Sequence, residues 1–212
     1  LRLVGEHGDA PALIAEARRR TLRWLHDGTD RPADADAARG MLAIAASRGD
    51  AALYDRLTAA RAATAADDTA TRSLLDAALA AFSQPALVER TLALLDEPDL
   101  ENEAAWRLLE GVMERRAPRA LTVARLAAQP ASRPWWWVTY LSADQACDPA
   151  ELETVADSAR NQKLAPALAA ALARRRVEVG VCAATRARMR DKAGAAFAAR
   201  RSRPTASGIK HP

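Results

Sequence analysis

Apolar residues recur at helical spacing along most of the chain, and residues 41–57 show the pattern most clearly. The apolar positions of this stretch are Met41, Leu42, Ile44, Ala45, Leu53, Tyr54 and Leu57. Between the two groups, Gly49 can adopt the left-handed conformation that ends many helices. Asp50 then offers a side-chain oxygen to the free N–H groups that begin the next helix. The stretch therefore predicts two helices joined by a tight break.

Similar breaks, marked by Gly, Pro, Ser or Asp, recur near residues 8, 49, 83, 117 and 148, about 31–41 residues apart. This spacing is typical of a two-helix repeat. The helices expected between the breaks are Pro11–Leu25, Asp34–Arg48, Ala51–Thr64, Thr69–Phe82, Pro85–Leu95 capped by Ser83, Glu101–Arg116, Pro118–Ala128, Pro149–Gln162 and Leu164–Arg200. Abundant Ala and Leu, with no β-branched runs, favour helix throughout. The sequence predicts an all-α superhelical stack of antiparallel helix pairs.

Charge is unevenly distributed along the 212 residues. Residues 160–212 carry a net charge of +11 and residues 1–159 a net charge of −7, which together give the overall +4. The basic end can pair with the acidic part or bind an acidic partner. The acidic part argues against nucleic acid as a partner, because a nucleic-acid track needs basic residues on several repeats. Charges also interrupt every apolar run before it reaches membrane-spanning length, so we expect no membrane partner.

No constellation of catalytic residues is visible. The histidines His7, His26 and His211 are far apart and form no HExxH pair, and the glycines form no phosphate-binding loop. We therefore assign no catalytic residue, no cofactor-binding residue and no metal ligand. Cys147 and Cys182 lack metal-type spacing, and two separate thiols suggest a reducing compartment, so we expect a cytoplasmic location. Cys147 precedes a helix start, where a reactive thiolate is favoured, but a small residue at a junction is the simpler interpretation.

Two further runs of residues invite a functional interpretation. Residues 135–137 are three consecutive tryptophans, which form either a stacking platform or, as we favour, a plug between helices. Arg174, Arg175 and Arg176 read first as a solvated face. However, helical spacing places Arg175 and Arg186 on an otherwise apolar stripe, from position 168 to position 193, with Arg174 and Arg176 beside it. Arg175 and Arg186 are therefore the candidates for an ion pair with a buried carboxylate or for a role in a groove.

The order of these motifs resembles the C-terminal helical domain of the zinc aminopeptidases of the aminopeptidase N and puromycin-sensitive type. The segments that carry the resemblance are LVGEHGDAPALIAEARRR, MLAIAASRGDAALYDRL, TRSLLDAALAAFSQPALVERTLALL, CDPAELETVADSAR and LAAALARRRVEVGVCAATRARM. The resemblance spans about residues 1–200 and is weakest over residues 96–146. It implies a superhelix of the HEAT or armadillo kind, followed by a polar tail at 201–212.

The resemblance also implies a function. The domain would enclose the peptide chamber over an upstream catalytic domain, which holds the zinc and removes N-terminal residues from peptides. The partners would be that catalytic domain and the peptide substrate. Because the first residue is Leu1, within an apolar group, we expect the chain to be a fragment of such an enzyme. The alternative is a free-standing helical-repeat module that binds protein or nucleic acid.

Overall fold

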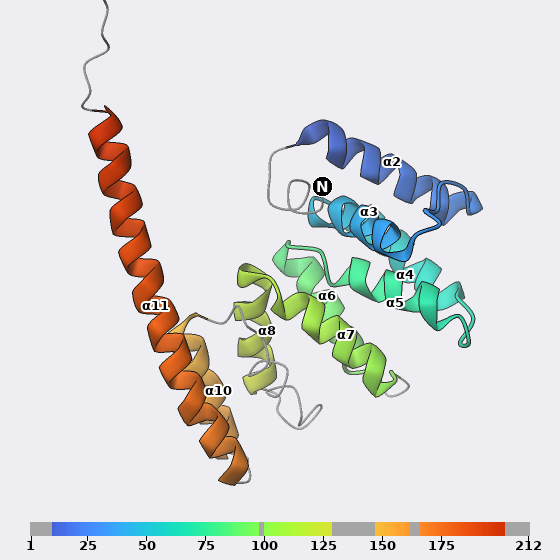
Figure 1. Ribbon diagram of the computed structural model, residues 1–212. Helices are drawn as coiled ribbons and strands as arrows, with labels where there is room; N and C mark the ends of the chain where they lie inside the picture. The colour runs from blue at the N-terminus through green and yellow to red at the C-terminus, as the bar shows by residue number, and fades with distance from the viewer. Residues whose placement is uncertain (1–9, 98–99, 129–146, 162–165, 202–212) are drawn as a thin grey trace, which may run out of the picture. The chain divides into compact units, whose positions relative to one another are not determined.

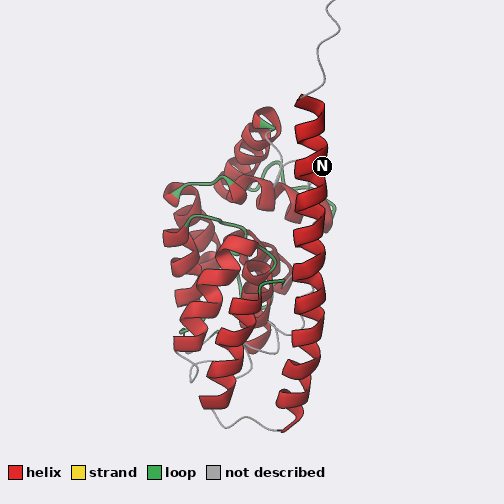
Figure 2. Ribbon diagram, turned by 90° about the vertical axis from the view of Figure 1, so that its left-hand side faces the viewer, coloured by secondary structure: helices red, strands yellow, loops and turns green. Residues whose placement is uncertain are grey.

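The computed structural model describes residues 10–97, 100–128, 147–161 and 166–201. Within these ranges every regular element is an α-helix, as Figure 1 and Figure 2 show. The helices are α2 (Pro11–Asp27), α3 (Ala35–Ser47), α4 (Ala51–Ala63), α5 (Thr69–Leu79), α6 (Pro85–Leu94), α7 (Asn102–Met113), α8 (Arg116–Ala128), α10 (Pro149–Asn161) and α11 (Pro166–Arg201). The prediction of an all-α chain is confirmed for the described residues. They divide into two compact units, Leu1–Gln145 and Ala146–Pro212, and we treat each by itself.

Aspartates begin three of the helices in unit 1. The carboxylate of Asp34 accepts a hydrogen bond from the Ala37 N–H at 2.7 Å, and Asp50 accepts one from Leu53 at 2.9 Å. Asp68 does the same for α5. Each side chain satisfies one of the N–H groups that a helix start leaves without a partner. The expected role of Asp50 is confirmed, and these caps explain why the predicted helix starts agree with the structure to within a residue or two.

Two of the local expectations are wrong. The positive φ angles among the described residues belong to Gly28 (76°) and Asp30 (62°), so Gly49 is not left-handed. Gly49 is instead crowded, because a Cβ built there would lie 2.7 Å from Cε1 of Phe82. Ser83 does not cap α6, whose cap position is Gln84. The Ser83 hydroxyl donates to the carbonyl oxygen of Ser47 at 3.2 Å, which joins the loop before α6 to the end of α3.

The core of unit 1 lies between sequential helices that pack side by side. Helix α5 contacts α3, α4 and α7, while α2 packs on α3. The largest fully buried side chains are Tyr54, Phe82, Leu42, Leu53, Leu57, Leu75, Leu79, Leu92, Leu108 and Leu109. The rings of Tyr54 and Phe82 meet edge to face with centroids 5.1 Å apart. Burial raises the pKa of the Tyr54 hydroxyl, which shares a hydrogen bond with the Thr91 hydroxyl at 3.1 Å.

Contacts between helices two apart in the chain, and between the loops before them, recur at nearly constant sequence separation. The loop before α6 bonds to the loop before α4, since Gln84 Nε2 donates to the Gly49 carbonyl at 2.8 Å across 35 residues. Arg115 donates in the same way to the Ala81 carbonyl, 34 residues earlier. Between α4 and α6, Arg90 pairs with Asp55 at 2.6 Å, and between α6 and α8, Arg125 pairs with Glu89 at 2.8 Å; these residues are 35 and 36 positions apart. The contacts are consistent with a stacked arrangement of the helices.

The core of unit 2 lies between α10 and the first half of α11. Its buried apolar residues are Leu152, Val155 and Ala156 on α10 and Leu172 and Val179 on α11. Arg176 of α11 forms two hydrogen bonds with the Glu153 carboxylate of α10, at 2.9 and 3.0 Å, and lowers the pKa of that carboxyl. Helix α11 runs without a break through Gly180. Residues 186–194 of α11 are all exposed, so packing ends well before the helix does.

Candidate functional site

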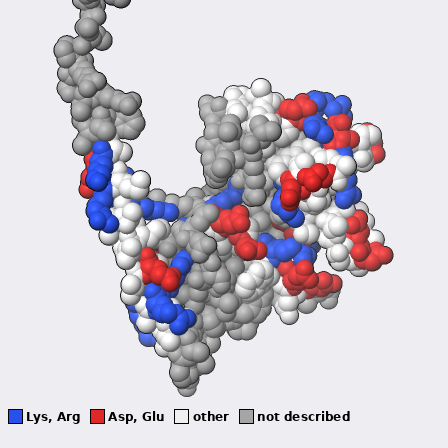
Figure 3. Space-filling model, in the orientation of Figure 1, with Lys and Arg blue, Asp and Glu red and all other residues white. Residues whose placement is uncertain are grey.

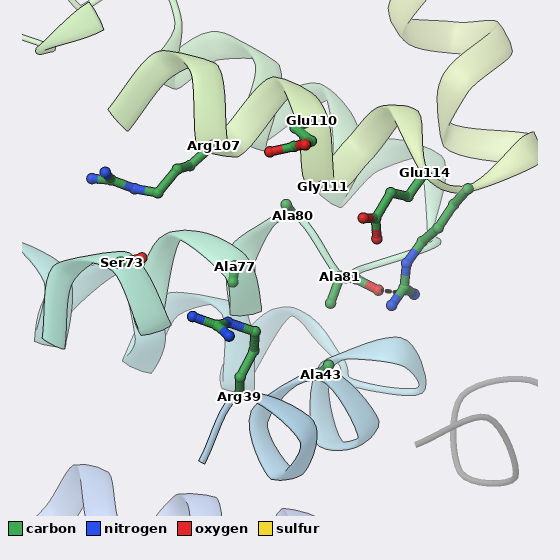
Figure 4. Close-up of a pocket in the computed structure, with 11 residues that line it drawn as sticks. Arg39, Ala43, Ser73, Ala77, Ala80, Ala81, Arg107, Glu110, Gly111 and Glu114 are labelled. Atoms are coloured by element: carbon green, nitrogen blue, oxygen red, sulfur yellow. Dashed lines mark hydrogen bonds between the residues drawn. The ribbon is translucent and has the colours of Figure 1, made fainter. Parts of the chain in front are cut away.

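One pocket of unit 1, which we call the alanine pocket, lies among α3, α5 and α7 and has a volume of about 230 Å³. Its small lining residues are Ala43, Ser73, Ala77, Ala80, Ala81 and Gly111, and its charged ones are Arg39, Arg107, Glu110, Glu114 and Arg115. Figure 4 shows the small residues of α5 between Arg39, which extends from α3, and the charged side chains of α7. The pocket thus combines a floor of small residues with an edge of both charges.

The shallow floor follows from a close approach between the end of α5 and α7. A Cβ built at Gly111 would lie 2.7 Å from the Cβ of Ala80, closer than real Cβ contacts. Gly111 and Ala80 are therefore small because the backbones leave no room for larger side chains. The same shortage of side-chain atoms leaves the space that forms the pocket. Arg115 holds this corner by donating to the carbonyl oxygen of Ala81.

The arginines at the edge differ in how firmly they are held. Arg39 pairs with Asp36 at 2.8 Å, and both of these side chains are exposed, by 41% and 87%. Such an exposed pair is weak, so the Arg39 guanidinium can exchange Asp36 for another anion at little cost. Arg107 is 24% exposed, lies 2.7 Å from Glu103, and reaches toward a second carboxylate at Asp76. Arg39 is the cation of this pocket that is most free to bind a ligand.

A second pocket, which we call the Asp76 pocket, has a volume of about 150 Å³ and shares Arg107 with the first. Asp76 is 1% exposed, and its Oδ1 lies 2.6 Å from Nε of Arg61. Its Oδ2 lies 3.6 Å from Nη2 of Arg107. The carboxylate thus connects the end of α4 with α5 and α7. Removing one partner of a buried pair leaves a charge without compensation, so we expect Asp76 to hold these helices together.

The two pockets have linings that suit the binding of a ligand. Neither is lined by His or Cys, and the side chains that line them provide guanidinium, carboxylate and small apolar surfaces. In the ranges that the structure describes, no group of three His, Cys, Asp or Glu side chains comes together as a metal site would need. These side chains suit a peptide, whose carboxylate groups pair with guanidinium and whose backbone passes close to small residues.

Arg175 and Arg186, the candidates chosen from the sequence, lie on α11 in unit 2 rather than at these pockets. The Arg175 side chain is 11% exposed, and one of its contacts is an ion pair with Glu178 at 2.8 Å. Glu178 is 59% exposed, and the pairing of Arg175 with a buried carboxylate stays a prediction. Arg186 is exposed rather than part of a buried stripe, and Met189 further along that stripe is 67% exposed. A groove-facing role for either arginine stays a prediction.

The two cysteines are not separate thiols. A disulfide joins Cys147, directly before α10, to Cys182 on α11, with their Cα atoms 5.4 Å apart. This pairing removes the basis for expecting a reducing compartment, because disulfides are rare in the cytosol. The cytoplasmic location is a prediction that the disulfide does not favour. No helix among the described residues is both long and apolar enough to span a membrane.

Sequence reasoning missed Asp76, although a signal for it was present. Asp76 interrupts the dense apolar run of Leu74, Leu75, Ala78 and Leu79 on α5. A charged residue inside such a run either reaches water or is paired with an opposite charge within the core.

The tryptophan run at residues 135–137 lies outside the described residues, as does the apolar group that begins at Leu1. Comparison with models of known protein families, with curated proteins and with solved structures finds no match for this chain.

Proposed function

We propose that this chain is the non-catalytic C-terminal helical domain of a zinc metalloaminopeptidase of the aminopeptidase N or puromycin-sensitive type. In this proposal the domain forms a HEAT- or armadillo-like superhelix that encloses a peptide chamber over an upstream catalytic domain. That catalytic domain holds the zinc and removes N-terminal residues from peptides. The chain itself contributes surface and charge around the substrate.

The recurring contacts in unit 1 support the superhelical part of the proposal. Equivalent loops and equivalent helices bond to each other across 34–36 residues, from Ser47 and Ser83 to Glu89 and Arg125. In a repeat protein each unit contacts its neighbours through the same positions, so one separation dominates. A globular helical bundle has no reason to repeat one separation in this way.

Two of the segments that carry the family resemblance, MLAIAASRGDAALYDRL and TRSLLDAALAAFSQPALVERTLALL, span breaks between helices of the stack. MLAIAASRGDAALYDRL covers most of α3, the break at Gly49 and Asp50, and the first turns of α4. Gly49 is the position where Phe82 of the next pair approaches the backbone, and Asp50 caps α4. Glycine and capping residues are required at breaks between helices, so we expect a loosely defined family pattern to include them.

The alanine pocket is the observation that carries the substrate-enclosing role. It lies among the first helices of three successive pairs, and small residues let an extended chain approach the helix backbones. Arg39 at its edge is only weakly paired, with the exposed Asp36. In the proposed chamber, Arg39 and Arg107 attract the carboxylates of a bound peptide, including its C-terminus. In this proposal the two arginines affect long peptides only, because a single aminoacyl group is too short to reach from the catalytic domain to this pocket.

The test uses the full-length enzyme that contains this chain, with Arg39→Ala, Arg107→Ala and a matched control. Arg90→Ala is the control, because Arg90 also forms an exposed ion pair, with Asp55, but lines neither pocket. We expect kcat/KM for a long peptide to fall about tenfold in each pocket variant, equivalent to about 1.4 kcal/mol for one hydrogen bond to a charged group. The same constant for an aminoacyl anilide should stay unchanged.

The outcomes separate the alternatives. Equal kcat/KM for long peptides in the enzyme and both pocket variants would exclude a substrate role for this pocket. A full-length protein without aminopeptidase activity, or without the HExxH zinc helix upstream, would exclude the family assignment itself. The isolated chain should hydrolyse no aminoacyl anilide and hold no stoichiometric zinc, which metal analysis of the purified chain measures.

The second candidate, a free-standing helical-repeat module for protein or nucleic acid, draws support from α11. Residues 186–194 hold four exposed cations, Arg186, Arg188, Arg190 and Lys192, and one acid, Asp191. The Lys and Arg side chains along this helix are visible in Figure 3. If the family assignment fails, titration of the chain with an acidic peptide and with duplex DNA at increasing salt distinguishes the two partners.

A further inference from the structure

The disulfide of unit 2 joins the residues before α10 to the middle of α11. Cys147 is 8% exposed and directly precedes α10, while Cys182 is half-buried in the middle of α11. Val179, one turn before Cys182, is 1% exposed, whereas residues 186–194 are all exposed. The disulfide therefore lies where the packing between α10 and α11 ends. It links the two helices covalently at that end of their interface.

The apolar core between the two helices is small. The buried apolar residues of the pair are Leu152, Val155, Ala156, Leu172 and Val179. The ion pair between Glu153 and Arg176 is exposed on both sides, at 52% and 43%, and such pairs stabilise weakly. A two-helix unit with so small a core depends on a covalent link more than a large domain does. Opening the link should therefore release the start of α10 from α11.

We propose that Cys147–Cys182 is a thiol–disulfide switch that controls the order of α10 and of α11 beyond Val179. In the reducing step, one small-molecule thiolate attacks a sulfur of the disulfide and forms a mixed disulfide, and a second thiol completes the exchange. The Cys147–Cys182 bond is broken, both cysteines become thiols, and two reduced thiol molecules become one oxidised disulfide. Oxidised glutathione, or another small disulfide, drives the reverse reaction with the same balance.

The physical consequence follows from where support for α11 ends. With the link open and the start of α10 released, the residues just after Val179 lose the neighbours that hold them helical, and the exposed residues 186–194 lose the ordered turns that precede them. A helix without packing is marginal in water unless it is long and rich in strong helix formers. Opening the disulfide therefore exposes the α10–α11 interface and loosens the exposed basic stretch at residues 186–194. Unit 1 contains neither cysteine and should not respond.

Hydrogen–deuterium exchange of the full chain, oxidised and then reduced with dithiothreitol, tests this proposal. Reduction should raise exchange about tenfold in peptides from residues 149–161 and 175–194 and leave peptides from α3 to α7 unchanged. The Cys147→Ser, Cys182→Ser double variant is the matched control, and its exchange should resemble that of the reduced chain with or without dithiothreitol. Equal exchange in the oxidised and reduced chain, or a response of the double variant to dithiothreitol, would overturn the switch.

A second measurement separates a switch from a permanent link. The full chain is equilibrated with mixtures of reduced and oxidised glutathione, and its free thiols are alkylated. Mass spectrometry of the intact chain then counts the alkylated cysteines. A switch should pass from a fully linked form to a doubly alkylated form as the mixture becomes more reducing. A link that survives a large excess of reduced glutathione is a permanent structural bond, and two alkylated cysteines in the most oxidising mixture mean that the link does not form. Either result refutes the proposal.

Discussion

At the scale of single residues, the close approaches between backbones decide which positions tolerate change. Gly49 and Gly111 each lie where a neighbouring side chain comes within 2.7 Å of the position that a Cβ would occupy. Gly40, in the middle of α3, has nothing within 4 Å of that position. These three glycines therefore have different roles. Gly49 and Gly111 permit close contact between elements, whereas Gly40 only weakens its helix.

Gly49→Ala and Gly40→Ala should therefore change stability in opposite directions. Gly49→Ala forces the Phe82 ring or the Leu53 side chain to move, and overpacking of this kind costs about 1–3 kcal/mol. Gly40→Ala restricts the unfolded chain and favours helix, which stabilises by about 0.4–1 kcal/mol. Thermal or urea unfolding of the two variants measures both effects. A stable Gly49→Ala chain would mean that Phe82 has room to move.

Asp76 should be the most sensitive charged residue of unit 1. Asp76→Ala leaves Arg61, whose side chain is 15% exposed, without the carboxylate that it contacts at 2.6 Å. Breaking a buried pair by removing one partner costs about 3–5 kcal/mol, whereas an exposed pair contributes about 0–1 kcal/mol. Asp55→Ala, which removes the exposed partner of Arg90, is the matched control. Urea unfolding that gives both variants the same stability would argue that water reaches Asp76.

At the scale of the helices, the sequence predicted starts better than ends, for a physical reason. A start is marked by one capping side chain, and Asp34, Asp50 and Asp68 each make the hydrogen bond that their position implies. An end depends on which tertiary contacts follow. Helix α5 ends at Leu79, earlier than the predicted Phe82, because Phe82 turns into the core against Tyr54. Ser83 has cap chemistry but bonds across the stack instead.

The cap at Asp50 gives a prediction with a defined pH dependence. The backbone N–H of Leu53, and then Arg18, lower the pKa of the Asp50 carboxyl below its usual 3.8. A carboxyl with a lowered pKa stabilises the fold fully above its unfolded value, near pH 4, and this contribution is lost as the pH falls through the lowered value. Asp50→Asn keeps a capping oxygen but removes the charge, so its stability should approach that of the original chain below about pH 4.

Asp50→Ala provides the comparison for the cap itself. It removes the capping oxygen at every pH and should cost about 1 kcal/mol even in acid. Unfolding by urea across the pH range measures both variants. If Asp50→Asn is as unstable as Asp50→Ala at neutral pH, the charge and not the hydrogen bond holds the start of α4. If the two variants match the original chain, Arg18 and Leu53 find other partners.

At the scale of the whole chain, the period of the breaks was visible in the sequence, but the contacts that use it were not. Periodicity shows which face of a helix is apolar and so predicts that helices stack. It does not show that Arg125 reaches Glu89 or that Arg115 reaches Ala81, since long polar side chains have many possible partners. The pockets were missed for the same reason, because both arise from how neighbouring helices approach. The disulfide requires knowledge of which elements meet.

Unit 1 should fold without unit 2, because its core is formed by its own helices from α2 to α8. A chain that ends at Gln145 should keep a strongly helical circular dichroism spectrum and unfold in a single cooperative transition. Leu57→Ala in that chain tests whether the transition reports the core. Leu57 is 0% exposed, and truncating a buried Leu costs about 2–5 kcal/mol. A gradual transition that Leu57→Ala does not shift would show that residues after Gln145 are needed to order the stack.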